Sequence, residues 1–144
     1  MLHGRFGNTT GSPYLEAHVY IPRLNLRGLV SFLVDTGADG TLLMPADSKK
    51  LGVKSRALRN PTMSDGIGGQ AKGFTERVIL AFSDTRFVYS YFLDIEISAS
   101  TRANQRFPSL LGRDILDRWR FVIDRPRDRI TFTPGRWDLR LKLH

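Results

Sequence analysis

The sequence contains no cysteine among its 144 residues. This absence excludes a disulfide framework, a thiol nucleophile and a cysteine-based zinc site. Histidine is also scarce: His3, His18 and His144 are scattered, and no His-Glu-x-x-His arrangement occurs. The Gly-x-Ser-x-Gly motif of many serine hydrolases is missing too. We therefore expect no metal centre and no other cofactor, and neither serine nor cysteine nucleophilic catalysis.

Long hydrophobic runs are missing as well. A typical apolar run, residues 29–34, includes Ser31 and is far too short to span a bilayer. Residues 1–20 lack the basic start and following apolar stretch of a signal peptide. We expect no membrane segment, and the cytoplasm is the default location for such a cysteine-free chain.

Acidic residues are outnumbered, with 14 Asp and Glu against 22 Lys and Arg and a net charge of +8. Such a balance can attract acidic partners. In the last third of the chain, however, arginines alternate with aspartates, as in Arg113-Asp114 and Asp124-Arg125. This pattern is more typical of a solvated, locally paired surface than of a nucleic-acid interface. We expect no specific nucleic acid as partner, and a basic β-barrel that binds nucleic acid remains an alternative based on charge alone.

Helical periodicity is rare, and short strand patterns dominate. Apolar and polar residues alternate over residues 15–21, as expected for a half-buried strand. Further strands are predicted at residues 29–34, 41–44, 74–82, 87–97, 121–124 and 129–133, the last folding back on the one before it. Short helices are predicted at residues 45–51 and 113–119. The spacing predicts an all-β domain over residues 14–134, after a flexible N-terminal arm of residues 1–13 and before a C-terminal extension of residues 135–144.

One acid stands at the end of an apolar strand. Asp35 follows residues 29–34 directly and begins the sequence Asp-Thr-Gly, in which Gly37 can make a turn without steric cost. Carboxylates at the ends of buried strands are typical of catalytic sites. An isolated Asp-Thr-Gly, however, favours an Asp that serves its own turn.

Two further segments change this balance. The glycine-rich stretch Gly66, Ile67, Gly68 and Gly69 lies between two predicted strands, where its backbone amides can approach a ligand closely. No Gly-Lys-Ser/Thr follows it, so a phosphate loop is disfavoured and an ordinary hairpin turn is the alternative. Residues 108–116 run from an apolar pair through glycine into a short helix, which alone indicates only a buried strand followed by a helix.

In this order and spacing the three segments resemble the retropepsin-like, or retroviral-type, aspartic protease family. The resemblance covers residues 14–124 and implies a single-domain acid protease barrel with a glycine-rich flap hairpin and one short C-terminal helix. It also implies an aspartic endopeptidase that acts on peptide or protein substrates. Viral subunits interlace their termini into an intersubunit sheet, whereas residues 1–13 and 125–144 make this chain more similar to prokaryotic and cellular relatives.

The resemblance also assigns roles to individual residues. Asp35 is the expected catalytic carboxylate, Thr36 is expected to hydrogen-bond across a dimer, and Gly37 is expected to support the loop. Asp39 is expected to form a structural ion pair with Arg113. Substrate-binding residues implied by the resemblance are Ala38, Asp39, Gly66, Ile67, Gly68 and Gly69.

This chemistry requires two carboxylates that share a proton. The chain has one Asp-Thr-Gly and no Asp-Ser-Gly, so a two-fold homodimer must supply the second acid. The alternative is a catalytically inactive, protease-like module for peptide binding or dimerisation, because fold alone does not determine function.

Overall fold

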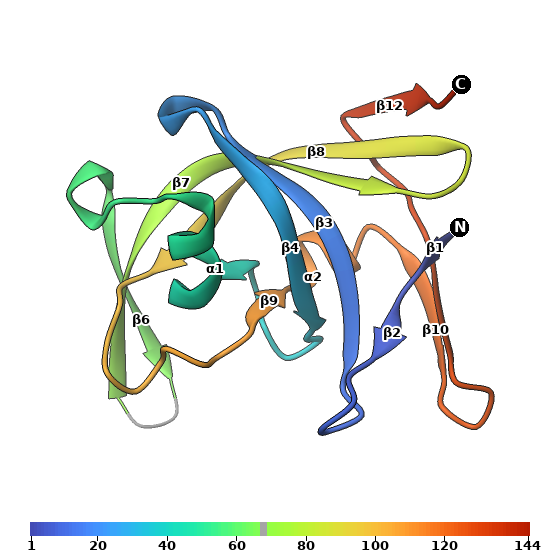
Figure 1. Cartoon of the computed structure of the whole chain (residues 1–144), viewed down its shortest axis with the longest axis horizontal. Helices are drawn as coiled ribbons and strands as arrows, with labels where there is room; N and C mark the ends of the chain where they lie inside the picture. Colours follow the sequence, from blue (N-terminus) through green and yellow to red (C-terminus); the bar gives the residue numbers. More distant parts are fainter. Residues whose placement is uncertain (67–68) are drawn as a thin grey trace.

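The computed structural model describes residues 1–66 and 69–144, which form mainly strands (Figure 1). In the first half the strands are β1 (Leu2–His3), β2 (Arg5–Phe6), β3 (Pro13–Ile21), β4 (Leu26–Val34), β5 (Leu42–Leu43) and β6 (Pro61–Gly66). In the second half they are β7 (Gly69–Ser83), β8 (Phe87–Ser98), β9 (Ser109–Leu111), β10 (Arg120–Asp124), β11 (Arg129–Thr133) and β12 (Leu139–Lys142). The helical segments are η1 (Pro22–Leu24), α1 (Pro45–Leu51), η2 (Ser55–Ala57) and α2 (Arg113–Leu116). The prediction of an all-β chain with little helix is confirmed.

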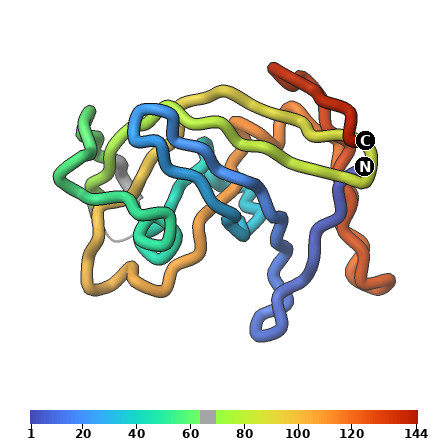
Figure 2. The backbone as a smooth tube through the Cα atoms, turned by 45° about the horizontal axis from the view of Figure 1, so that its top comes forward, coloured from blue at the N-terminus to red at the C-terminus, as the bar shows by residue number. Residues whose placement is uncertain are grey.

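The main sheet closes on itself. Its strand order is β12-β8-β5-β9-β4-β3-β7-β6, and an additional pairing of β8 with β7 closes a barrel of β8, β5, β9, β4, β3 and β7. Short strand β9 lies between β4, to which it is parallel, and β5, to which it is antiparallel. This insertion brings the segment before α2 beside the end of β4 (Figure 2).

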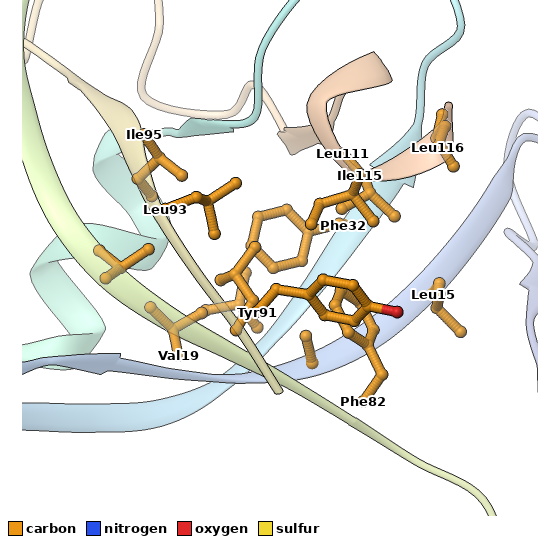
Figure 3. Close-up of a cluster of buried hydrophobic side chains, with 14 of the residues drawn as sticks. Leu15, Val19, Phe32, Phe82, Tyr91, Leu93, Ile95, Leu111, Ile115 and Leu116 are labelled. Atoms are coloured by element: carbon orange, nitrogen blue, oxygen red, sulfur yellow. The ribbon is translucent and has the colours of Figure 1, made fainter. Parts of the chain in front are cut away.

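The barrel interior is filled by the apolar residues of alternating strand positions. Figure 3 shows Phe32, Phe82, Tyr91, Leu111 and Ile115 meeting in this core, where each is completely or almost completely buried. Burying one such large side chain stabilises the fold by about 2–3 kcal/mol. The alternation that predicts the strands therefore also predicts which side chains face inward.

Tryptophan Trp119 joins this core through both its ring and its N–H group. Its Nε1 donates a 2.8 Å hydrogen bond to the hydroxyl of Tyr91, which donates in turn to the carbonyl of Gly135 at 2.8 Å. Burial raises the pKa of Tyr91. The chain after α2 is thus held against the barrel by a buried polar contact as well as by apolar packing.

Residues 1–13 differ from the flexible arm expected from their composition. Leu2 is 1% exposed and lies in the core, in register with Phe132 of β11. Arg5 of β2 pairs with Tyr14 of β3. One buried apolar residue and two short ladders order a segment whose many small and polar residues suggested mobility.

The C-terminal residues 135–144 also pack on the barrel. Strand β12 pairs with β8 from Leu139 opposite Ser90 onward, and all of its residues are exposed. The guanidinium of Arg140 stacks over the rings of Phe87 and Trp137, at 4.4 and 4.9 Å from their centroids. These contacts hold the extension against one end of β8.

Both chain ends reach the turn between β7 and β8 (Figure 2). The N-terminal ammonium of Met1 forms a 2.8 Å ion pair with Asp84, and the amide of Leu143 donates to the carbonyl of Arg86 at 2.8 Å. Burial of Asp84 disfavours its charged form. Hydrogen bonds from the ammonium and from the amides of Arg86 and Phe87 outweigh this cost and lower the pKa of Asp84 to about 2.

The β6–β7 hairpin is anchored at its base by an ion pair. Glu76 of β7 is 6% exposed and accepts hydrogen bonds from Nε and Nη2 of Arg23 in η1, at 3.0 and 2.5 Å. The same Nη2 donates to the carbonyl of Ala57 in η2 at 2.8 Å.

The described residues include no helix long and apolar enough to cross a membrane.

Candidate active site

Asp35 is the first residue after β4, and the barrel fixes its backbone. Its amide donates a 3.0 Å hydrogen bond to the carbonyl of Leu111, so the β4–β9 pairing continues to this residue. Phe32 and Val34 are buried in the core, so the alternation of β4 directs Asp35 away from it together with Leu33. The carboxylate therefore lies partly exposed at the end of a rigid strand.

The loop after Asp35 orients one oxygen of its carboxylate. The amide of Gly37 donates to Oδ1 at 2.9 Å, and the amide of Ala38 donates to the Asp35 carbonyl at 3.2 Å. A Cβ added at Gly37 would lie 3.2 Å from the same Oδ1. Gly37 does not have the positive φ that favours glycine, so close approach to the carboxylate is what disfavours a larger residue there.

Arg113, at the start of α2, holds the loop from the side. Its Nη1 donates to the carbonyl of Thr36 at 2.8 Å, and its Nη2 donates to Oδ1 of Asp39. The structure thus contains the pairing of Asp39 with Arg113 that the sequence analysis expects. The Asp39 side chain is 93% exposed, and an ion pair at such a site is worth about 0–1 kcal/mol. Its main effect is to fix the position of the loop.

A second, more buried connection was missed in the sequence analysis. The hydroxyl of Thr41 donates to Oδ1 of Asp114 at 2.7 Å, and the Thr41 amide donates to Oδ2 at 2.8 Å. The Gly112 amide donates in turn to the Thr41 hydroxyl at 3.2 Å. The sequence suggested that Asp114 pairs with its neighbour Arg113 on a solvated surface. In the structure Asp114 is not part of such a pair. The only signal in the sequence was the position of Asp114 in the first turn of a predicted helix. Nothing local identified the buried Thr41 as its partner.

Gly112 allows α2 to approach the loop this closely. A Cβ at this position would lie 2.4 Å from the backbone carbon and oxygen of Gly40. Two amides at the start of α2 donate to loop carbonyls: Arg113 to Ala38 at 2.9 Å and Asp114 to Asp39 at 3.2 Å. The loop after Asp35 and the segment from Gly112 to Asp114 thus form one hydrogen-bonded unit.

A row of leucines lies beside this unit. Leu110 of β9 is in register with Leu33 of β4 on one side and with Leu42 of β5 on the other. All three are only half-buried, whereas their neighbours Val34, Leu43 and Leu111 point into the core. They line the face of the sheet from which Asp35 projects. The sequence analysis did not select these leucines, because a half-exposed leucine in a strand looks like any core residue.

Two residues of the glycine-rich segment end the described part of the β6–β7 hairpin. The predicted substrate-binding residues Gly66 and Gly69 form the last pair in its register. Ile67 and Gly68 lie outside the described residues. The strands of a hairpin are therefore present where the flap is expected.

Comparisons with known proteins agree with this geometry. Residues 23–115, which contain the Asp35 loop and the start of α2, match the family described as Aspartyl protease. No curated protein sequence matches the chain. The fold is similar to that of a retropepsin-like aspartic protease from Rickettsia conorii, with a TM-score of 0.61 and 22% identity over 89% of this chain and 96% of that one.

A second similar fold is that of EIAV protease, solved with the inhibitor HBY-793. Here the TM-score is 0.51 and the identity 24%, over 77% of this chain and 90% of that one. At these identities the two solved structures establish the fold, and the family match establishes the relationship. The chain therefore belongs to the aspartyl protease family and has the retropepsin-like fold.

Proposed function

We propose that this chain is one subunit of a homodimeric aspartic endopeptidase in which each subunit contributes one Asp35. The observation that carries the proposal is the fixed, partly exposed carboxylate at the end of β4, held by the Gly37 amide at 2.9 Å. The chain offers no second Asp-Thr-Gly, so the other carboxylate must come from a second copy. In such a dimer the two carboxylates lie close enough to share one proton.

Hydrolysis then follows the general acid–base scheme of paired carboxylates. The ionised Asp35 removes a proton from a water molecule, whose oxygen attacks the carbonyl carbon of the scissile peptide bond. The protonated Asp35 of the other subunit donates its proton toward the carbonyl oxygen. When the C–N bond breaks, a proton passes to the leaving nitrogen, and the products are a carboxylate and an amine.

Residues of the same loop have supporting roles in this scheme. Thr36 is exposed, so its side chain is available to hydrogen-bond with the equivalent loop of the other subunit. Gly37 orients the carboxylate, and Arg113 together with Asp39 holds the loop. The substrate would lie extended beside Ala38 and Asp39.

The substrate groove would select apolar side chains near the scissile bond. Leu33, Leu42 and Leu110 offer a continuous apolar row on the face from which Asp35 projects. The β6–β7 hairpin, whose last described pair is Gly66 and Gly69, would close over an extended peptide and pair with it as an added strand. Apolar residues flanking the cleavage site are therefore expected.

Replacing Asp35 by Asn tests the assignment. Cleavage of a denatured protein or a peptide library by Asp35→Asn should fall to background, because the amide cannot act as the base. Asp94→Asn, at an exposed position of β8, changes the charge equally and should leave cleavage unchanged. Equal cleavage by the Asp35→Asn variant and the wild type would refute the proposal. Binding of peptides without turnover by the wild type would instead favour the inactive, peptide-binding module.

A further inference from the structure

An apolar hollow lies between α1, η2 and the paired ends of β7 and β8. In Figure 1 α1 lies beside the arrowhead of β8. The hollow has a volume of about 270 Å³, and it is lined neither by the loop after Asp35 nor by the row of leucines beside that loop. An apolar cavity of roughly 150 Å³ can hold benzene, so this hollow can hold an aromatic ring with a short chain. The apolar part of its wall is formed by Pro45, Val53, Leu58, Phe74 and Ile97.

The walls of the hollow are fixed by contacts within the fold. Asn104 is only 8% exposed, and its Nδ2 donates a 2.8 Å hydrogen bond to the carbonyl of Ala99. This bond holds the wall of residues 98–100. Phe74 of β7 and Ile97 of β8 are in register and form the adjoining wall. The hollow is therefore preformed, as small-molecule sites usually are.

A second, basic hollow adjoins the apolar one. Both are lined by Lys49, Val53 and Ser55, and the second is also lined by Lys54 and Arg56. Among the described residues, neither hollow is lined by Asp or Glu. Three cationic side chains therefore stand beside the apolar hollow, without a carboxylate in its lining to balance them.

The same cations lack the acidic partners that arginines have elsewhere on this protein. Arg127, for example, binds Asp124 at 3.0 Å. In the described part of the chain no ion pair involves Lys49, Lys54 or Arg56. Their positive charge is available to an anion from outside the chain.

Lys49 is held in place by a neutral acceptor. Its Nζ donates to Oε1 of Gln105 at 2.5 Å, and Nε2 of Gln105 donates to the hydroxyl of Ser100 at 2.7 Å. Ser100 also lines the apolar hollow. An ammonium group has three N–H donors, so Lys49 can donate to a ligand without breaking its bond to Gln105.

We propose that the two hollows form one binding site for a small organic acid. Its apolar body occupies the first hollow, and its carboxylate lies against Lys49, Lys54 and Arg56 in the second. Burial of the apolar body supplies affinity, and charge-assisted hydrogen bonds from the cations select a carboxylate. The site does not depend on the proposed function, because none of its residues belongs to the Asp35 loop.

Another apolar hollow fits such a ligand less well. It has a volume of about 240 Å³ and lies on the outer face of β3, β4 and β7, where Tyr20 and Ile79 are part of its wall. In the described chain its lining contains one Lys or Arg, which is Arg27. The hollow beside α1 has three such cations around it, so it selects an anion more strongly.

Titration of isotope-labelled wild type with phenylbutyrate, followed by the amide signals in NMR spectra, tests the site. The ring fills the apolar hollow and the carboxylate reaches the cations, so we expect a Kd of about 1 mM. Amides of residues 53–58 and 98–100 should shift, and those of the Asp35 loop should not. The neutral analogue phenylbutanol keeps the ring and lacks the charge, so it should bind about fivefold more weakly.

Three variants separate the contributions of charge and apolar burial. Lys54→Gln combined with Arg56→Gln should weaken phenylbutyrate about tenfold and leave phenylbutanol within about twofold of the wild type. Arg129→Gln combined with Lys142→Gln removes two exposed cations from β11 and β12 and should change neither affinity. Ala99→Leu fills the apolar hollow and should abolish binding of both compounds, with folding checked by its thermal melt.

The outcomes decide the proposal without any assay of cleavage. Selective loss of phenylbutyrate affinity in the double variant at residues 54 and 56 supports the site. Absence of saturable binding by the wild type, equal affinities for acid and alcohol, or shifts confined to the Asp35 loop would overturn it. A wild type that binds phenylbutyrate as described but cleaves no peptide would keep this site and refute the protease.

Discussion

The buried hydrogen bonds of Thr41 offer the most direct test of how this chain positions the Asp35 loop. The change Thr41→Val keeps the shape of the side chain and removes only its hydroxyl. Asp114 then loses a 2.7 Å hydrogen bond and the Gly112 amide loses its acceptor. Thr41 is 1% exposed, so water does not replace either contact.

The expected cost follows from these two losses. A hydrogen bond to a charged group is worth about 1.5–3 kcal/mol, and an unsatisfied buried amide costs about 1–3 kcal/mol. We expect the free energy of unfolding to fall by about 3 kcal/mol, which lowers the melting temperature by about 10 °C in a chain of this size. The loop between Asp35 and Thr41 should also shift, and a displacement of about 1 Å can reduce kcat about 100-fold.

Urea unfolding followed by the fluorescence of buried Trp119 measures the first effect, and peptide hydrolysis by folded protein measures the second. Thr41→Ser is the matched control: it keeps the hydroxyl, loses one buried methyl group and should cost only about 1 kcal/mol. Thr133→Val, at an exposed end of β11, controls for the valine itself. Equal stability of the Thr41→Val and Thr41→Ser variants, or wild-type kcat in the less stable one, would contradict the role given to Thr41.

Two other substitutions address the carboxylate and the chain ends. Gly37→Ala adds a Cβ that would lie 3.2 Å from Oδ1 of Asp35. We therefore expect about a tenfold loss of kcat/KM with a melting temperature within about 3 °C of the wild type. A fully active alanine variant would show that the close approach of residue 37 to the carboxylate is unimportant. Asp84→Asn removes a carboxyl whose pKa is lowered to about 2 in the folded protein, below its unfolded value of about 3.9. The ionised carboxylate therefore stabilises the fold above pH 4, and this stabilisation is lost as pH falls toward 2. The variant should therefore be less stable than the wild type by about 1–2 kcal/mol at pH 6 and equal to it near pH 2; a constant difference between denaturation curves at pH 6 and pH 2 would argue against this linkage.

The strands were predictable because their signals are local. The period of two in residues 15–21 follows from which side of a sheet each residue faces, and the turn residues mark where β10 ends and β11 begins. For residues 1–13, in contrast, the local signals did not predict the strands. Their order depends on Leu2 entering a core made largely of residues distant in the sequence, and a single apolar residue leaves no period to detect.

The residues of the candidate site also divide into those that a local sequence signal predicts and those that it does not. The carboxylate and its glycine are two positions apart in the sequence, so Asp35 and Gly37 could be selected from a motif. The pairing of Asp39 with Arg113 came from the family resemblance, because nothing local relates residues 74 positions apart. The contact between Thr41 and Asp114 spans 73 positions and lacked such a guide. Local patterns of charge even suggested a wrong partner for Asp114.

These long-range contacts also determine what the proposed dimerisation has to supply. The Asp35 loop is already held within one subunit, by the Leu111 carbonyl, the Gly37 amide and Arg113. A separated subunit should therefore keep its loop folded and lose activity only because the second carboxylate is absent. Assembly would then control activity by bringing two preformed half-sites together rather than by folding either one.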